Sequence, residues 1–200
     1  MLEIIKQIKS AIILLIVLSI LTGIIYPAMV TIVAQLIFPW KANGSLLQHN
    51  QKIIGSQLIG QLFSSDKYFW SRPSATVPFS YNAQNSSGSN LGPANSNFLA
   101  DVKARVDRLR ASDPTSKHFV PVDLVTSSAS GLDPDISPLA AYYQVSRIAK
   151  ARKLSESTLQ KLIQQEITDR TLKFLGEPRV NVLQLNLALD NLSQQENQPR

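Results

Sequence analysis

An uncharged and almost wholly apolar run from Ser10 to Trp40 constrains this chain more than any other feature of its sequence. As an α-helix the run extends roughly 46 Å, whereas the hydrocarbon core of a bilayer is about 30 Å thick. Backbone amides in lipid must bond within the segment, so a helix is the only single segment that can cross. The sequence therefore predicts one transmembrane helix over residues 10–35.

No second apolar run long enough to span a bilayer follows in the polar remainder of the chain. A cleaved signal peptide is the alternative interpretation, but no small-x-small site of the Ala-x-Ala type follows at the expected distance. We therefore expect a tethered protein made of an N-terminus (1–9), the transmembrane helix (10–35), a connector (36–52), one domain (53–190) and a flexible tail (191–200).

The short N-terminal flank predicts the orientation of the helix. It carries Lys6, Lys9 and the amino terminus against one acidic residue, Glu3. Short basic flanks stay in the cytoplasm, whereas long domains cross the membrane largely regardless of their charge. The sequence thus predicts a cytoplasmic N-terminus and an extracytoplasmic domain.

Composition limits what this domain can be. The net charge of +6 is mild and the basic residues form no dense stripe, which argues against a nucleic-acid binder. The densest cationic cluster, Arg147 to Lys153, has helical spacing and is interpreted as a solvated face. Without cysteine the domain must be stabilised by its core, for which its length is sufficient, and a structural zinc site is excluded.

Periodicity and turn residues predict a mixed α+β domain. We expect helices capped by Asn95 or Asn97 and by Ser137, and a third that begins near Ser155 or Ser157. The first of these ends at Asp113, the second near Arg152 and the third at Gly176. A short helix is expected over 54–63, and strands over 66–71, 119–126 and 179–189.

The stretch from Ser80 to Asn97 is rich in Asn, Ser and Gly and almost free of aliphatic residues. Such a composition is typical of a flexible surface loop. The alternative is an ordered loop whose polar groups bond a partner or a neighbouring segment. The residues alone leave both interpretations open.

Motifs for autonomous catalysis are absent from the sequence. It contains neither a Gly-x-Ser-x-Gly elbow nor a Walker A motif. A triad of Ser130, His118 and Asp123 is conceivable, but the serine lies in ordinary turn sequence. Asp133 and Asp135 precede a helix start, where carboxylates usually serve the turn and the helix dipole. We therefore predict a non-enzyme without catalytic or metal-binding residues.

The transmembrane helix itself suggests a partner. Ser19 and Gly23 form a small-x-x-x-small pair beside Thr22, and such a face allows a second helix to approach closely. The alternative is a helix that merely tethers the domain.

Several segments, taken together and in order, resemble the KdpC family, the accessory subunit of the bacterial Kdp potassium-transporting P-type ATPase. The resemblance covers essentially the whole chain as far as Asp190. The motifs that carry it are Tyr68–Ala75, Ser86–Pro93, Val120–Thr126, Ser128–Pro134, Tyr143-Gln144 with Arg147, and Gly176–Val182.

The resemblance implies a bacterial plasma-membrane complex with a channel-like potassium-binding subunit, a P-type ATPase subunit and a small single-helix subunit. The family is credited with raising the ATP affinity of the ATPase subunit in a ternary complex, and Gln144 matches the glutamine implicated. No cofactor would then be firmly bound. An extracytoplasmic domain does not meet cytosolic ATP, so a reversed orientation, an indirect effect and a mistaken nucleotide assignment all stay open.

A helix that starts at Ser137 predicts that Gln144 and Arg147 share a face available to a partner, with Tyr143 more buried. On this basis Gln144→Ala should leave folding intact and alter the ATP dependence of the ATPase.

A tethered ligand-binding or hydrolase module that acts alone is the alternative function. The candidate partner contacts are Ser19, Gly23, Arg72, Asn82, Ser87, Asn90, Asp123, Ser130, Asp133 and Arg147.

Overall fold

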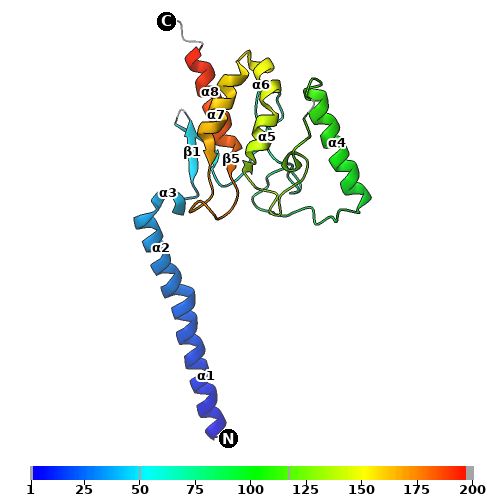
Figure 1. Ribbon diagram of the computed structural model, residues 1–200. Helices are drawn as coiled ribbons and strands as arrows, with labels where there is room; N and C mark the ends of the chain where they lie inside the picture. The colour runs from blue at the N-terminus through cyan, green and yellow to red at the C-terminus, as the bar shows by residue number, and fades with distance from the viewer. Residues whose placement is uncertain (1, 50, 117, 197–200) are drawn as a thin grey trace. The chain divides into compact units, whose positions relative to one another are not determined.

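The computed structural model describes residues 2–49, 51–116 and 118–196 and contains two compact units, Met1–Leu46 and Leu47–Arg200 (Figure 1). The first unit is helical, and the second combines helices with short strands. The α+β class expected from the sequence is confirmed.

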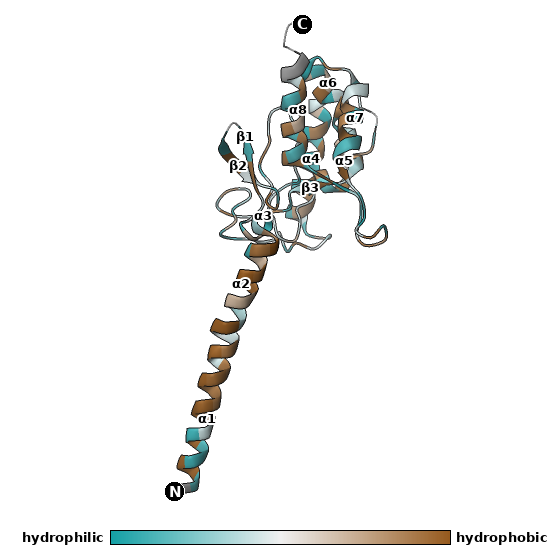
Figure 2. Cartoon of the chain, turned by 90° about the vertical axis from the view of Figure 1, so that its left-hand side faces the viewer, coloured by the Kyte–Doolittle hydropathy of each residue, from teal (hydrophilic) through white to brown (hydrophobic). Residues whose placement is uncertain are grey.

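The first unit contains one long apolar helix, Glu3–Ile37, long and apolar enough to cross a membrane. Figure 2 shows its apolar character in brown along most of α1 (Leu2–Ile20) and α2 (Tyr26–Ile37). Between them Leu21–Ile25 forms a π-helical turn, in which the Tyr26 N–H donates to the Leu21 carbonyl. Pro27 lacks the N–H that would continue the α-helical pattern, which accounts for this local change. A short helix, α3 (Pro39–Ala42), follows.

The second unit starts with a two-stranded sheet of β1 (Leu46–His49) and β2 (Lys52–Ser56). The helix expected over 54–63 is therefore wrong. Its apolar residues fall within β2 and the turn that follows, where the Gln61 side-chain amide donates to the Ile54 carbonyl. A side-chain bond to the backbone here replaces the helical hydrogen bond that the periodicity suggested.

The main sheet has the order β3-β5-β4 and is antiparallel, formed by β3 (Asp135–Ile136), β4 (Ile167–Thr168) and β5 (Arg179–Asn181). Ile136 and Ile167 both pair with the fully buried Val180. The helices that follow β3 and β5 lie near β5 in Figure 1, and their inner faces form much of the core: α5 (Pro138–Tyr143), α6 (Val145–Arg152), α7 (Glu156–Glu166) and α8 (Val182–Glu196).

Local capping signals placed the helix starts correctly. Asn95, rather than Asn97, accepts the N–H groups of Asn97 and Phe98 at the start of α4 (Ser96–Ser112). Ser137 caps α5 and Ser155, rather than Ser157, caps α7. Two helices differ from expectation in extent. The helix α7 ends at Glu166 instead of Gly176, and the helix expected from Ser137 to Arg152 is divided at Gln144 into α5 and α6.

Of the two later strands expected, the one over 119–126 is wrong and the one over 179–189 is correct only in its first three residues. Within 119–126 the chain forms a 3-10 turn, Val122–Leu124, and Phe119 is 96% exposed. From 179 onward only Arg179–Asn181 is a strand, and α8 follows at once. The Asn181 side chain accepts the Gln184 N–H at the start of this helix, so the polar residue ends the strand.

Candidate functional site

A segment without regular secondary structure, through Phe69 and Trp70, lies buried among the helices of the domain. It belongs to the strand expected over 66–71, yet it pairs with two side-chain amides instead of a strand. Asn186 accepts the Phe69 N–H at 2.9 Å and donates to the Phe69 carbonyl at 3.0 Å. Gln144 accepts the Trp70 N–H at 2.7 Å and donates to the Trp70 carbonyl at 3.2 Å. The strand expected over 66–71 is therefore wrong: Asp66 and Lys67 lie in a turn, and the partners of Phe69 and Trp70 come from α8 and from the α5–α6 junction.

Gln144 uses every hydrogen-bonding position of its amide. Besides its two bonds to Trp70, it donates to the Ala140 carbonyl at 3.2 Å and accepts an N–H of Arg147 at 2.7 Å. Its side chain is 1% exposed. A carboxamide has two donor and two acceptor positions, and here all four are occupied. Gln144 therefore has no position left for a ligand.

Arg147 completes this buried group. Its guanidinium donates to the carbonyls of Asp66 and Tyr68 and stacks 4.1 Å from the centre of the Trp70 ring. Burial lowers the pKa of Arg147 to about 10, so the group stays charged at neutral pH. We refer to Gln144, Arg147 and Asn186, with the Phe69-Trp70 segment that they hold, as the amide clamp.

The exposure expected of this pair is corrected by the structure. Gln144 and Arg147 do share a face and contact one another, but both are buried, whereas Tyr143 is the less buried residue. The interpretation of 147–153 as a solvated face is wrong for Arg147 for the same reason. Its three hydrogen-bond partners compensate for the loss of water around the guanidinium.

Polar loops form a second group of contacts, which we call the loop platform: residues 72–76, 80–88 and 128–133. The Ser74 hydroxyl donates to the Gly131 carbonyl at 2.7 Å, and the Ser87 N–H donates to the Ser130 carbonyl at 2.9 Å. Arg72 pairs with Asp133 at 2.9 Å. The stretch from Ser80 to Asn97 is thus bonded to a neighbouring segment, which favours the ordered alternative.

Two further bonds connect the start of this loop to its neighbours. The Tyr81 hydroxyl donates to the Arg72 carbonyl at 2.6 Å, and burial raises the pKa of Tyr81 to about 12. Asn82 is buried, and its side chain donates to the Val77 carbonyl. Asn82 therefore serves the loop itself and presents little surface to a partner.

The remaining candidates lie apart from these two groups. Asp123 accepts the Ser137 N–H at 2.7 Å and so holds the start of α5. Asn90 is exposed and has a left-handed backbone conformation. Ser19 and Gly23 are exposed on the long helix, and a Cβ added to Gly23 would meet nothing within 4 Å.

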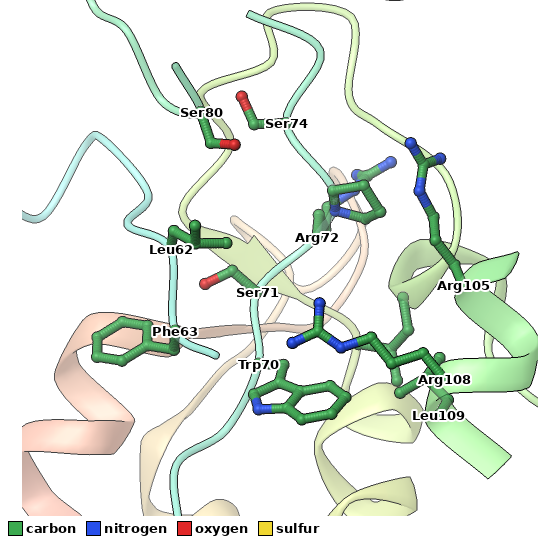
Figure 3. Close-up of a pocket in the computed structure, with 12 residues that line it drawn as sticks. Leu62, Phe63, Trp70, Ser71, Arg72, Ser74, Ser80, Arg105, Arg108 and Leu109 are labelled. Atoms are coloured by element: carbon green, nitrogen blue, oxygen red, sulfur yellow. The ribbon is translucent and has the colours of Figure 1, made fainter. Parts of the chain in front are cut away.

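A cavity of about 250 Å³ lies between the two groups, with Trp70 at its base (Figure 3). Arg105 and Arg108 of α4 reach it from one side, and Ser71, Arg72 and Ser74 line the other. Neither α4 arginine is among the residues that the sequence motifs singled out. They lie three residues apart, so their shared face was detectable, but nothing in the sequence placed that face beside Trp70.

Comparison with known proteins matches nearly the whole chain. A family model described as "K+-transporting ATPase, c chain" matches residues 8–191. A protein of Herpetosiphon aurantiacus named "Potassium-transporting ATPase KdpC subunit" is 55% identical over 92% of this chain and 95% of its own length. Proteins of the same name from Methylococcus capsulatus and Paraburkholderia xenovorans are each 54% identical, over 94% and 92% of this chain and 99% and 96% of their own lengths.

Proposed function

The chain belongs to the KdpC family of potassium-transporting ATPase subunits, and from this premise we propose that it acts as a membrane-tethered accessory subunit that supports assembly and nucleotide response. The observation that carries the proposal is a match that spans both the apolar helix and the folded domain. The proposed partners are the channel-like potassium-binding subunit, the P-type ATPase subunit and a small single-helix subunit. Co-purification of these subunits with the tagged chain from membranes is the direct test.

The proposed topology places the N-terminus in the cytoplasm and the domain outside. Protease added to intact spheroplasts should then cut the chain beyond Lys41 and release the domain, because the basic N-terminal flank favours the inside. The measurement is immunoblotting of a tag at each end, with a cytoplasmic protein as a control for intact membranes. Full protection of the domain, with digestion only after lysis, would reverse the orientation.

The small-residue face of the helix is proposed to contact a neighbouring helix. Gly23→Leu should weaken this association by about 1 kcal/mol, roughly fivefold, because the larger side chain prevents close approach. A Cβ added at Gly23 meets nothing within 4 Å, and leucine favours helices, so the variant helix should form normally. The measurement is the fraction of partner subunits retained after detergent extraction.

Ala28→Leu is the matched control, because it enlarges another small residue outside the Ser19–Gly23 spacing. We expect it to retain the partners as the parent chain does. Equal retention by both variants would mean that Gly23 faces lipid.

The effect on ATP affinity is proposed to be indirect. Gln144 is saturated by Trp70, Ala140 and Arg147, so direct nucleotide binding by its amide would require the amide clamp to open. An extracytoplasmic domain is also separated from cytosolic ATP by the membrane. We therefore propose that Gln144 preserves the shape of the domain, and that this shape is transmitted to the ATPase subunit through subunit contacts.

A further inference from the structure

Arg108 is an exposed cationic side chain on α4. Among residues 2–49, 51–116 and 118–196 its guanidinium makes neither a hydrogen bond nor an ion pair. It stacks on the Trp70 ring instead, 4.7 Å from the ring centre. The stacking holds the guanidinium in place while its N–H groups stay free.

The charged residues that line the cavity beside Arg108 are all basic. Its described lining contains Arg72, Arg105 and Arg108 but neither aspartate nor glutamate. Arg72 bonds outside the cavity to Asp133, yet its Nε is buried without a partner. Arg105 donates through one nitrogen to the Val125 carbonyl at 2.9 Å and lies 3.9 Å from Asp101. Within the part of the chain that the structure describes, the guanidinium groups of Arg72 and Arg105 therefore use only some of their N–H groups in hydrogen bonds.

Trp70 brings the buried cation Arg147 close to the exposed cation Arg108. Both Arg108 and Arg147 approach its ring within 5 Å of the centre, at 4.7 and 4.1 Å. The charge of Arg108 contributes to the lowered pKa of Arg147, so the two cations repel one another, and an anion in the cavity would offset the repulsion. Ser80 adds a hydroxyl at the mouth (Figure 3).

We propose that this cavity binds an oxyanion group, a phosphate or a carboxylate, between Arg105 and Arg108 over the Trp70 ring. Guanidinium groups pair with such anions through two parallel hydrogen bonds. The cavity of about 250 Å³ is smaller than the roughly 300–1,000 Å³ of pockets that enclose drug-sized ligands, so it suits the anionic group alone and not a whole nucleotide. The group can come from a free anion or from an acidic side chain of a neighbouring subunit.

The test uses the full chain in detergent with Trp40 replaced by phenylalanine, which leaves Trp70 as the sole tryptophan. Pyrophosphate is titrated at constant ionic strength, with chloride as the reference, and Trp70 fluorescence is recorded. We expect a saturable change. Arg108→Gln should weaken binding at least tenfold, because it removes the charge and the fork of donors.

Arg110→Gln is the matched control, since Arg110 is an exposed arginine on the same helix and does not line the cavity. It should alter the dissociation constant less than twofold. Thermal unfolding checks that Arg108→Gln is folded, as expected for a residue without internal hydrogen bonds. A folded parent without a saturable response, or equal binding by both variants, would overturn the proposal.

The same titration in the assembled complex distinguishes the two sources. Binding that persists after assembly identifies a free anion as the occupant. Loss of binding on assembly, with weaker subunit retention by Arg108→Gln, identifies an acidic side chain of a partner. Co-purification of the parent chain tests the accessory role separately, so the two proposals can fail independently.

Discussion

Replacing Gln144 with alanine is expected to lower the free energy of unfolding of the domain by about 3–5 kcal/mol, because several buried groups lose their partners at once. The Trp70 N–H, the Trp70 carbonyl and the Ala140 carbonyl are all bonded by this one amide. Arg147 also loses an acceptor for its buried charge. This expectation replaces the sequence-based prediction that folding would be unaffected. Denaturant unfolding of the purified chain is the measurement.

Gln164→Ala is the matched control, since Gln164 is an exposed glutamine on α7. We expect its free energy of unfolding to lie within about 0.5 kcal/mol of the parent value. Unchanged stability of Gln144→Ala would mean that water replaces the amide and that the amide clamp contributes little.

The Gln144 variant also tests the proposed indirect effect on nucleotide response. Complexes that contain folded Gln144→Ala chain, assayed below its unfolding transition, should show a weaker apparent ATP affinity in potassium-dependent ATPase assays. Complexes that contain Gln164→Ala should behave as the parent. If the Gln144→Ala chain is destabilised but its complex keeps the nucleotide dependence of the parent, the shape of the domain does not control the response to ATP. That result would refute the proposed indirect effect.

Local signals in the sequence predicted local structure well. Asn95, Ser137 and Ser155 cap their helices because a side-chain oxygen within three residues satisfies a free N–H, and such spacing can be read directly. The apolar alternation after Arg179 was ambiguous. Val182, Leu185 and Leu189 also fit the helical period, and α8 buries all three. Burial, which the sequence does not give, decided between the two periods.

Contacts distant in sequence explain what could not be predicted at the site. The aromatic Phe69-Trp70 segment suggested a strand, but its partners are side-chain amides that lie 74 residues away at Gln144 and 117 residues away at Asn186. Family resemblance singled out Gln144 without indicating that it is buried. Arg147 was interpreted as a solvated cation and Arg108 was not singled out, and only the packing of α6 and α4 around Trp70 shows that Arg147 is buried and Arg108 exposed.

The second large effect is expected at Gly131, where valine should destabilise the loop platform by about 3 kcal/mol. Gly131 has a φ of +67°, a conformation that β-branched residues strongly disfavour. A Cβ there would lie 2.5 Å from the Ser87 carbonyl oxygen and 2.8 Å from a methyl group of Thr76. The backbone at Ser87 and Thr76 would have to move, and the Ser74 bond to the Gly131 carbonyl would be strained. Denaturant unfolding measures the loss.

Gly92→Val is the matched control within the 80–97 stretch. Gly92 does not adopt the left-handed conformation, and a Cβ there meets nothing within 4 Å, so we expect the free energy of unfolding to change by less than about 0.5 kcal/mol.

The loop platform also carries four candidate partner contacts: Arg72, Ser87, Ser130 and Asp133. Gly131→Val should therefore retain fewer partner subunits than Gly92→Val when both are compared as folded protein. Reduced stability with full retention would assign the platform to the fold alone and place the subunit contacts elsewhere on the domain.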